Sequence, residues 1–356
     1  MADLKDGKEG KPWQEAYASL TEFVRQRPEI RITPQSMRIP KPLRDDFYGH
    51  IDRVTERLAS QLAGDRLEKI KALADRVEIT RRKIYAESNL KRYRLPSSIE
   101  NLIVTPDQAV SRPLFELVMD SLQNTRKEAE LTDRAVQLLV PFLKDLQRGT
   151  YEAWAYLNII AAWHPVRFFG IITTDFARLT VTETDEVTMG HQVSSPDKRL
   201  PETVFETADG KTIAVKCEVG LELDYYGEKV SREKGYSSGG DTVDELAHRV
   251  LLAYRFPSPQ ELTLTADAER QFVKPTDLTC TFLLPSEMEN EYLFSSFVRH
   301  IRSVRSLRPV QILSFDENGA FPTEWISDPR IPKWERTAVY DNPAVLKTIA
   351  EKVFIS

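Results

Sequence analysis

Hydrophobic and polar residues alternate most regularly between Lys211 and Asp224. Successive side chains of a β-strand point to opposite faces, so this alternation predicts a strand. One face of the predicted strand carries polar side chains, which is typical of a strand with one side on a core and one side in water. The apolar positions are Ile213, Val215, Cys217, Val219, Leu221 and Leu223.

Asp209 and Gly210 directly precede this strand and predict a β-hairpin, because a type I′ turn requires positive φ at both central residues. A two-residue loop would pair Phe205 with Ala214 and Val204 with Val215. The same register would place Glu206 on the apolar face beside Ile213. This misfit predicts either a bulge or an apolar face that begins only beyond Ile213.

Two stretches of the first 93 residues, 12–27 and 43–93, have the apolar spacing of helices. Apolar residues recur every three or four positions over 12–27, which predicts an amphipathic helix that ends at Pro28. Four prolines between residues 28 and 42 predict a stiff, extended connector, because proline fixes φ and disfavours a helix. An apolar stripe over 43–93 then predicts one long bent helix, or two helices joined near Gly64.

Three further helices are expected before residue 165. Pro106 and Pro113 bracket a predicted connector, and Ser111 is the expected N-cap of a helix that extends to Asn124. Residues 131–146 and 151–163 predict two separate helices. Pro141 should kink or restart the first of these, because it cannot donate a helical hydrogen bond.

The pattern changes after Pro165. Predicted strands cover 168–174, 177–182, 261–265, 278–284 and 310–315, and predicted helices cover 241–254, 286–307 and 344–353. We therefore expect an α+β fold, in which a helical N-terminal domain precedes a mixed or antiparallel sheet domain with flanking helices. The expected boundaries are 1–42 for a tail, a short helix and the proline-rich connector, 43–165 for the helical domain and 166–356 for the sheet domain.

The composition is that of an ordinary globular protein, with 41% hydrophobic and 29% charged residues among 356. Two cysteines cannot form a disulfide framework or a four-cysteine metal site, so a reducing compartment is expected. The charged N-terminus lacks the apolar core of a signal peptide, and no apolar stretch is long enough to cross a bilayer. These features predict a soluble, cytoplasmic protein that is not bound to a membrane.

The net charge of −5 is unevenly distributed, because residues 1–100 carry 21 Lys and Arg against 16 Asp and Glu. Lysine and arginine neutralise phosphates, and tyrosine offers a stacking face for bases, so clusters of these residues are candidates for binding a polyanion. The first cluster comprises Arg81, Arg82, Lys83, Tyr85, Lys91, Arg92, Tyr93 and Arg94. The second comprises Arg299, Arg302 and Arg305, although cations near the end of a helix also complement its dipole.

Motifs of catalysis are absent from the sequence. It contains no H-E-x-x-H, no G-x-S-x-G, no G-x-G-x-x-G and no P-loop, and its five histidines are scattered. Glu218, Glu222 and Asp224 share the polar face of the predicted strand. Glu222 and Asp224 lie about 6.6 Å apart at a strand rise of about 3.3 Å per residue, so these two could share a divalent cation.

Two hypotheses follow from these patterns. The first is a non-enzymatic binding or assembly protein that needs no cofactor and contacts a protein partner or a polyanion, such as nucleic acid, through its basic helical clusters. The alternative is a metal-dependent hydrolase or nuclease-like enzyme, in which Glu222 and Asp224, with Glu218, hold Mg²⁺ or Mn²⁺ and residues 227–240 form a lid. The sequence does not decide whether the protein is an enzyme.

Overall fold

A computed structural model of the chain describes ten stretches of the sequence. The described residues are 12–124, 128–173, 179–189, 201, 203–219, 249–262, 276–282, 306–314, 334–339 and 342–354. They form an α+β fold in which helices predominate in the N-terminal part and a mixed sheet follows, which confirms the predicted fold class.

The chain divides into two compact units, each built from two segments. The first comprises Met1–Ala74 and Asn101–Gln147, and the second comprises Asp75–Glu100 and Arg148–Ser356. Helices α3 (Asp65–Glu87), α4 (Ser97–Val104) and α6 (Glu128–Ala162) contribute residues to both units. The predicted helical stretch 43–165 thus supplies residues to both units.

In the first unit, α1 (Pro12–Arg25) and α2 (Arg44–Ala63) pack together, and α2 also packs against α5 (Pro106–Asn124). The predicted apolar stripes are buried, including Trp13 and Leu20 on α1. Gly64 has a φ of +49° and separates α2 from α3, so the second of the two alternatives for this stretch is confirmed. Glycine suits this position because side chains rarely adopt positive φ.

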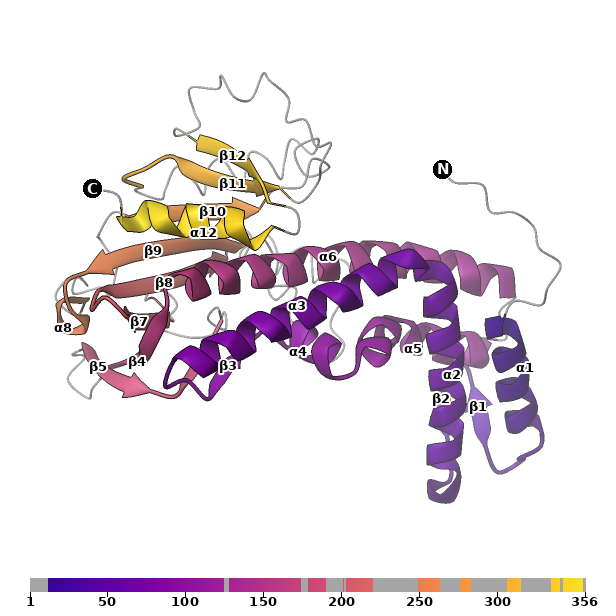
Figure 1. Cartoon of the computed structure of the whole chain (residues 1–356). Helices are drawn as coiled ribbons and strands as arrows, with labels where there is room; N and C mark the ends of the chain where they lie inside the picture. The colour runs from indigo at the N-terminus through magenta and orange to yellow at the C-terminus, as the bar shows by residue number, and fades with distance from the viewer. Residues whose placement is uncertain are drawn as a thin grey trace. The chain divides into compact units, whose positions relative to one another are not determined.

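The proline-rich stretch 28–42 differs from the prediction. Instead of a plain connector, it folds into an antiparallel hairpin of β1 (Arg31–Thr33) and β2 (Ser36–Arg38), followed by the short 3₁₀ helix η1 (Lys41–Leu43). Figure 1 shows this hairpin beside α1 and α2. Ile30 and Ile39 anchor the hairpin, because both are buried, one at each of its two ends.

Helices α5 and α6 also differ from the prediction, since both run through a proline. Pro113 lies inside α5, so Ser111 is a buried helix residue and not an N-cap. Pro141 lies inside the 35-residue helix α6. The buried positions Leu139 and Leu143 keep one helical face across Pro141, and packing of that face outweighs the lost hydrogen bond. Helix α4 was not predicted.

The second unit is built on an eight-stranded mixed sheet with the order β12-β11-β10-β9-β8-β7-β4-β5. Strands β10, β11 and β12 are parallel to one another, and the other neighbours are antiparallel. The strands are β4 (Pro165–Thr173), β5 (Leu179–Thr184), β7 (Thr203–Thr207), β8 (Thr212–Val219), β9 (Arg249–Phe256), β10 (Leu278–Phe282), β11 (Val310–Ser314) and β12 (Trp334–Ala338).

Strands β7 and β8 form the predicted hairpin, but its register differs by one residue. Val204 pairs with Ala214 and Phe205 pairs with Ile213. The loop is therefore one residue longer than a two-residue turn, and Gly210 supplies its positive φ of +77°. This register places Glu206 opposite Thr212, so the misfit in the two-residue alignment disappears.

Strand β8 is buried on both faces over its described side chains, and not on one face as predicted. Ala214 and Lys216, on the predicted wet face, are 0% and 5% exposed. Strand β9 was predicted as a helix, but Val250–Tyr254 are all buried between β8 and β10, as in a strand covered on both faces.

Five shorter elements of the described residues also belong to the second unit. Residues 259–262 form α8 (Pro259–Leu262), where the prediction had a strand beginning at Glu261. The C-terminal helix α12 (Pro343–Glu351) confirms the closing helix, with the side chain of Asn342 accepting from the backbone N–H of Ala344 and η3 (Lys352–Phe354) following. Strands β3 (Arg92–Arg94) and β6 (Glu186–Thr188) form a separate parallel pair.

Candidate nucleic-acid interface

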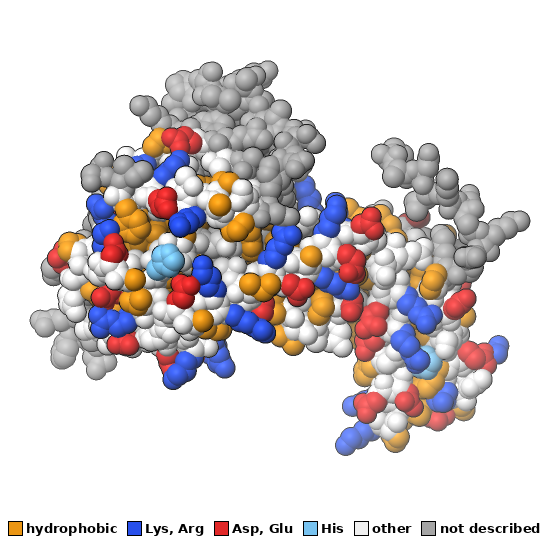
Figure 2. All heavy atoms as spheres, in the orientation of Figure 1, with side chains coloured by type: hydrophobic (Ala, Val, Ile, Leu, Met, Phe, Trp, Pro, Cys, Tyr) orange, Lys and Arg blue, Asp and Glu red, His pale blue; other side chains and the backbone are white. Residues whose placement is uncertain are grey.

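The first predicted basic cluster lies in the second unit, on the end of α3 and on β3. We call its six cations, Arg81, Arg82, Lys83, Lys91, Arg92 and Arg94, the paired cluster, because each lies beside a carboxylate. Two of these carboxylates, Asp185 and Glu186, come from a distant part of the chain. On the face drawn in Figure 2, basic and acidic side chains of the second unit lie interspersed.

Arg81 is the buried centre of the paired cluster, with 12% of its side chain exposed. Its guanidinium donates to both carboxylate oxygens of Glu100 at 2.7 and 2.9 Å, to Glu78 at 2.8 Å and to the carbonyl of Tyr93 at 3.3 Å. Burial opposes the charge of Arg81, but Glu100 and Glu78 outweigh it and raise the pKa of Arg81. Arg81 therefore fastens β3 to α3 and leaves little of its charge for a ligand.

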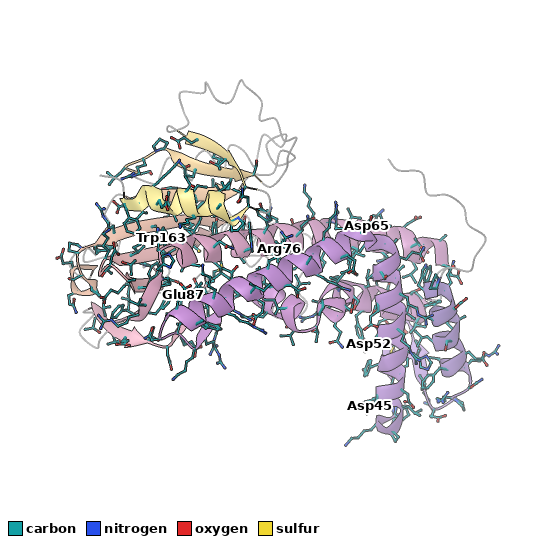
Figure 3. The ribbon with its side chains drawn as sticks, in the orientation of Figure 1. Asp45, Asp52, Asp65, Arg76, Glu87 and Trp163 are labelled. Carbon is teal, nitrogen blue, oxygen red and sulfur yellow. The ribbon has the colours of Figure 1, made fainter. Side chains whose placement is uncertain are left out.

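The exposed members of the paired cluster form surface ion pairs. Lys91 lies 2.8 Å from Asp185, and this hydrogen bond raises the pKa of Lys91 and lowers the pKa of Asp185. Arg92 and Arg94 both face Glu186 on the neighbouring strand β6. Glu87, labelled at the end of α3 in Figure 3, lies 4.0 Å from Lys83.

The two tyrosines predicted as stacking platforms have structural partners. The hydroxyl of Tyr85 accepts a hydrogen bond of 2.7 Å from the backbone N–H of Tyr93. Tyr93 is 1% exposed, and its hydroxyl lies 3.2 Å from the hydroxyl of Thr203. The ring of Tyr93 is therefore inside the protein, where it cannot stack on a base.

The other predicted site residues lie outside the described residues. They are Arg299, Arg302 and Arg305 of the second basic cluster, and Glu222 and Asp224 of the acidic group. The backbone of Glu218 pairs with Val250 in the sheet, and its side chain is not described. The metal-dependent alternative therefore stays a prediction.

A different basic surface, which the sequence did not lead us to predict, lies in the first unit on the β1–β2 hairpin and the start of α2. We call Arg31, Arg38, Lys41 and Arg44 the basic hairpin surface. All four side chains are exposed, and none forms an ion pair with a described residue. Arg44 donates only to the carbonyl of Ile39, at 3.3 Å.

Arg31 and Arg38 are directly opposite each other across the two strands. Opposite residues on one face of an antiparallel pair have Cβ atoms about 5 Å apart, and like charges there are destabilising. Thr33 and Ser36, the next pair on the same face, are hydrogen-bonded through their hydroxyl groups at 3.1 Å. The alternation of Arg31, Ile32 and Thr33 was the signal that could have revealed this hairpin.

His50 on α2 is a titratable group of the first unit whose pKa is lowered, chiefly by burial. Burial, Arg53 and Arg27 lower the pKa of His50, and Asp46 acts in the opposite direction. The His50 ring lies 4.6 Å from the ring of Phe23, and the guanidinium carbon of Arg27 lies 3.8 Å from the same ring centroid.

Nucleophilic and metal chemistry find no support among the described residues. Cys217 and Cys280 are both buried, and burial raises the pKa of the Cys280 thiol well above its ordinary value. The described residues contain no group of three or more His, Cys, Asp or Glu side chains that could hold a metal ion. None of the helices in the described part is long and apolar enough to cross a membrane.

Comparisons with known proteins add no functional information. No protein-family model matches the chain, and neither a curated protein nor a solved structure matches it significantly.

Proposed function

We propose that this chain is a non-enzymatic binding protein whose ligand is a polyanion, contacted through the basic hairpin surface. The observation that carries the proposal is that Arg31, Arg38, Lys41 and Arg44 form no ion pair with any residue that the structure describes, on a protein with a net charge of −5. Residues 27–44 hold five cations and one carboxylate, Glu29. Cations without ion-pair partners keep their full attraction for an incoming anion, and a bound anion relieves the repulsion between Arg31 and Arg38.

The paired cluster is a less suitable contact for a polyanion. Its cations must leave Glu78, Glu87, Glu100, Asp185 and Glu186 before they bind phosphate, and those carboxylates then repel the ligand. A surface with both signs of charge fits a protein partner better than a polyanion. Contact of the paired cluster with a protein partner stays a separate prediction.

Binding of inorganic polyphosphate to the purified protein tests the proposal. The triple variant Arg31→Gln/Arg38→Gln/Lys41→Gln should lose most of the affinity seen at low salt. The matched control Arg82→Gln/Lys83→Gln/Arg92→Gln removes the same charge from exposed residues of the paired cluster and should retain it. No binding of the unaltered protein in about 50 mM salt, or equal losses in both variants, would contradict the proposal.

A further inference from the structure

We infer that the basic hairpin surface binds double-stranded nucleic acid, with the β1–β2 ribbon entering a groove of the duplex. This inference rests on the proposed function and names the class of its ligand. It is carried by the shape of the surface, by its side chains and by the way in which the first unit holds it.

The shape is that of a two-stranded antiparallel ribbon. Neighbouring strands lie about 4.8 Å apart, and the major groove of B-form DNA, about 12 Å wide, admits such a ribbon. The outward face carries Arg31 and Arg38 as one opposite pair and Thr33 and Ser36 as the next. Arginine donates bidentately to guanine or phosphate, so Arg31 and Arg38 offer the donors that groove binding needs. The hydroxyl of Thr33 donates to the carbonyl of Ser36, which leaves the hydroxyl of Ser36 as the further polar group for a base edge or a phosphate.

Lys41 and Arg44 follow the ribbon in η1 and at the first position of α2. Both are exposed and suit contacts to the phosphate backbone, which position a protein on a duplex without reading its sequence. The carboxylates nearest in sequence to the basic hairpin surface are Glu29, Asp45 and Asp46. Asp45 is labelled at the start of α2 in Figure 3. Asp45 and Asp46 stabilise the positive N-terminus of α2.

The side chains favour a duplex over a single strand. Proteins that bind single strands combine basic grooves with aromatic side chains on which bases stack. Residues 24–46 contain no aromatic residue. Tyr48 on α2 is 39% exposed, but its ring lies 6.0 Å from the ring of Phe115, so the ribbon itself offers a single strand only polar and electrostatic contacts, whereas a duplex would also accept the ribbon in its groove.

The first unit presents the ribbon in a fixed position. Ile32 and Met37, on its inner face, pack against the core of the unit, and β1 contacts α5. Ile30 and Ile39 are 6% and 8% exposed at its two ends. A surface that is already ordered loses little conformational freedom on binding, which favours affinity.

The test compares three ligands of matched total charge: a 20-base-pair DNA duplex of mixed sequence, a single strand and inorganic polyphosphate. The unaltered protein should bind the duplex at least about tenfold more tightly than the single strand, and should protect guanine N7 in the major groove from methylation. Arg31→Gln/Arg38→Gln should remove both the preference and the protection. Lys41→Gln should weaken binding of all three ligands by a similar factor.

The outcomes separate this inference from the proposed function. Equal affinity for the three ligands, or no protection of guanine N7, would overturn groove binding and leave the polyanion proposal standing. Absence of binding to all three ligands at low salt would overturn both. Cooperative thermal unfolding of Arg31→Gln/Arg38→Gln at the same or a higher temperature verifies that the variant is folded, because the substitutions remove a like-charged pair.

Discussion

Residues 81–94 carry six cations and one carboxylate, and residues 27–44 carry five cations and one carboxylate. Folding gives these two similar stretches different electrostatic properties. The first acquires carboxylates from residues 78, 100, 185 and 186, whereas Arg31, Arg38, Lys41 and Arg44 of the second acquire no ion-pair partner among the described residues. The comparison shows that local charge in a sequence predicts a binding surface only when the compensating residues are also known.

Arg81→Met should have the largest effect on the free energy of unfolding, because Arg81 is the buried centre of the paired cluster. This variant tests the stabilising role of the cluster separately from any binding role. Removing one partner of a fully buried ion pair costs about 3–5 kcal/mol, and Glu100 is 32% exposed, so we expect a loss of about 2–4 kcal/mol. Urea unfolding measures this loss. Arg82→Met, at a side chain that is 74% exposed, should change stability by less than about 1 kcal/mol. Equal effects in the two variants would show that Arg81 is not a structural centre.

Arg31→Glu should convert the basic hairpin surface into a paired surface like that of residues 81–94. The new carboxylate lies opposite Arg38, so the free energy of unfolding should rise by about 0.2–1 kcal/mol. Affinity for polyphosphate should fall more than in Arg31→Gln, which removes a charge without adding one of opposite sign. Thermal unfolding and binding of both variants measure these changes. A loss of stability would indicate that Arg31 and Arg38 do not repel each other.

The smallest expected effect concerns the pKa of His50, which lies in the first unit. Its folded pKa lies below the ordinary 6.5, so the unfolded chain takes up the proton first as the pH falls. The contribution of His50 to stability is therefore present above about pH 6.5 and is lost as the pH falls toward the folded pKa. Arg53→Gln removes one cause of the low pKa and should raise it.

A bound polyanion should raise the pKa of His50 as well, because it screens the positive field of Arg53 and Arg27. NMR titration of the imidazole, with and without polyphosphate, measures this shift. Identical titrations of His50 would place the polyanion elsewhere.

The sequence predicted those elements whose pattern is local. The stripe through Phe47, Ile51 and Ile70 indicated α2 and α3, and the strand signal at residues 310–315 indicated β11. Strand β9 was predicted as a helix because Val250 and Leu251 have helical spacing from Leu246. In the sheet, β9 pairs with β8 and β10 and is buried on both faces. Contacts with residues distant in sequence therefore determine its structure.

The candidate site was harder to predict for the same reason. The cations at 81–94 were visible in the sequence, but Asp185 and Glu186 reach them only through the pairing of β3 with β6. The hairpin at 31–38 was not predicted, because the prolines of the stretch 28–42 indicated an extended connector. Its charge became significant only once the structure placed Arg31 opposite Arg38, with no ion pair from either side chain to a described carboxylate.

The salt dependence of polyanion binding tests the central claim most directly. Neutralising about four phosphates on a duplex should give a slope of log K against log salt of about −3.6. Arg31→Gln/Arg38→Gln should reduce the slope to about −1.8, and the matched control Arg82→Gln/Arg92→Gln should leave it unchanged. A slope that falls in the control and not in the hairpin variant would contradict the account, because the polyanion would then bind the paired cluster.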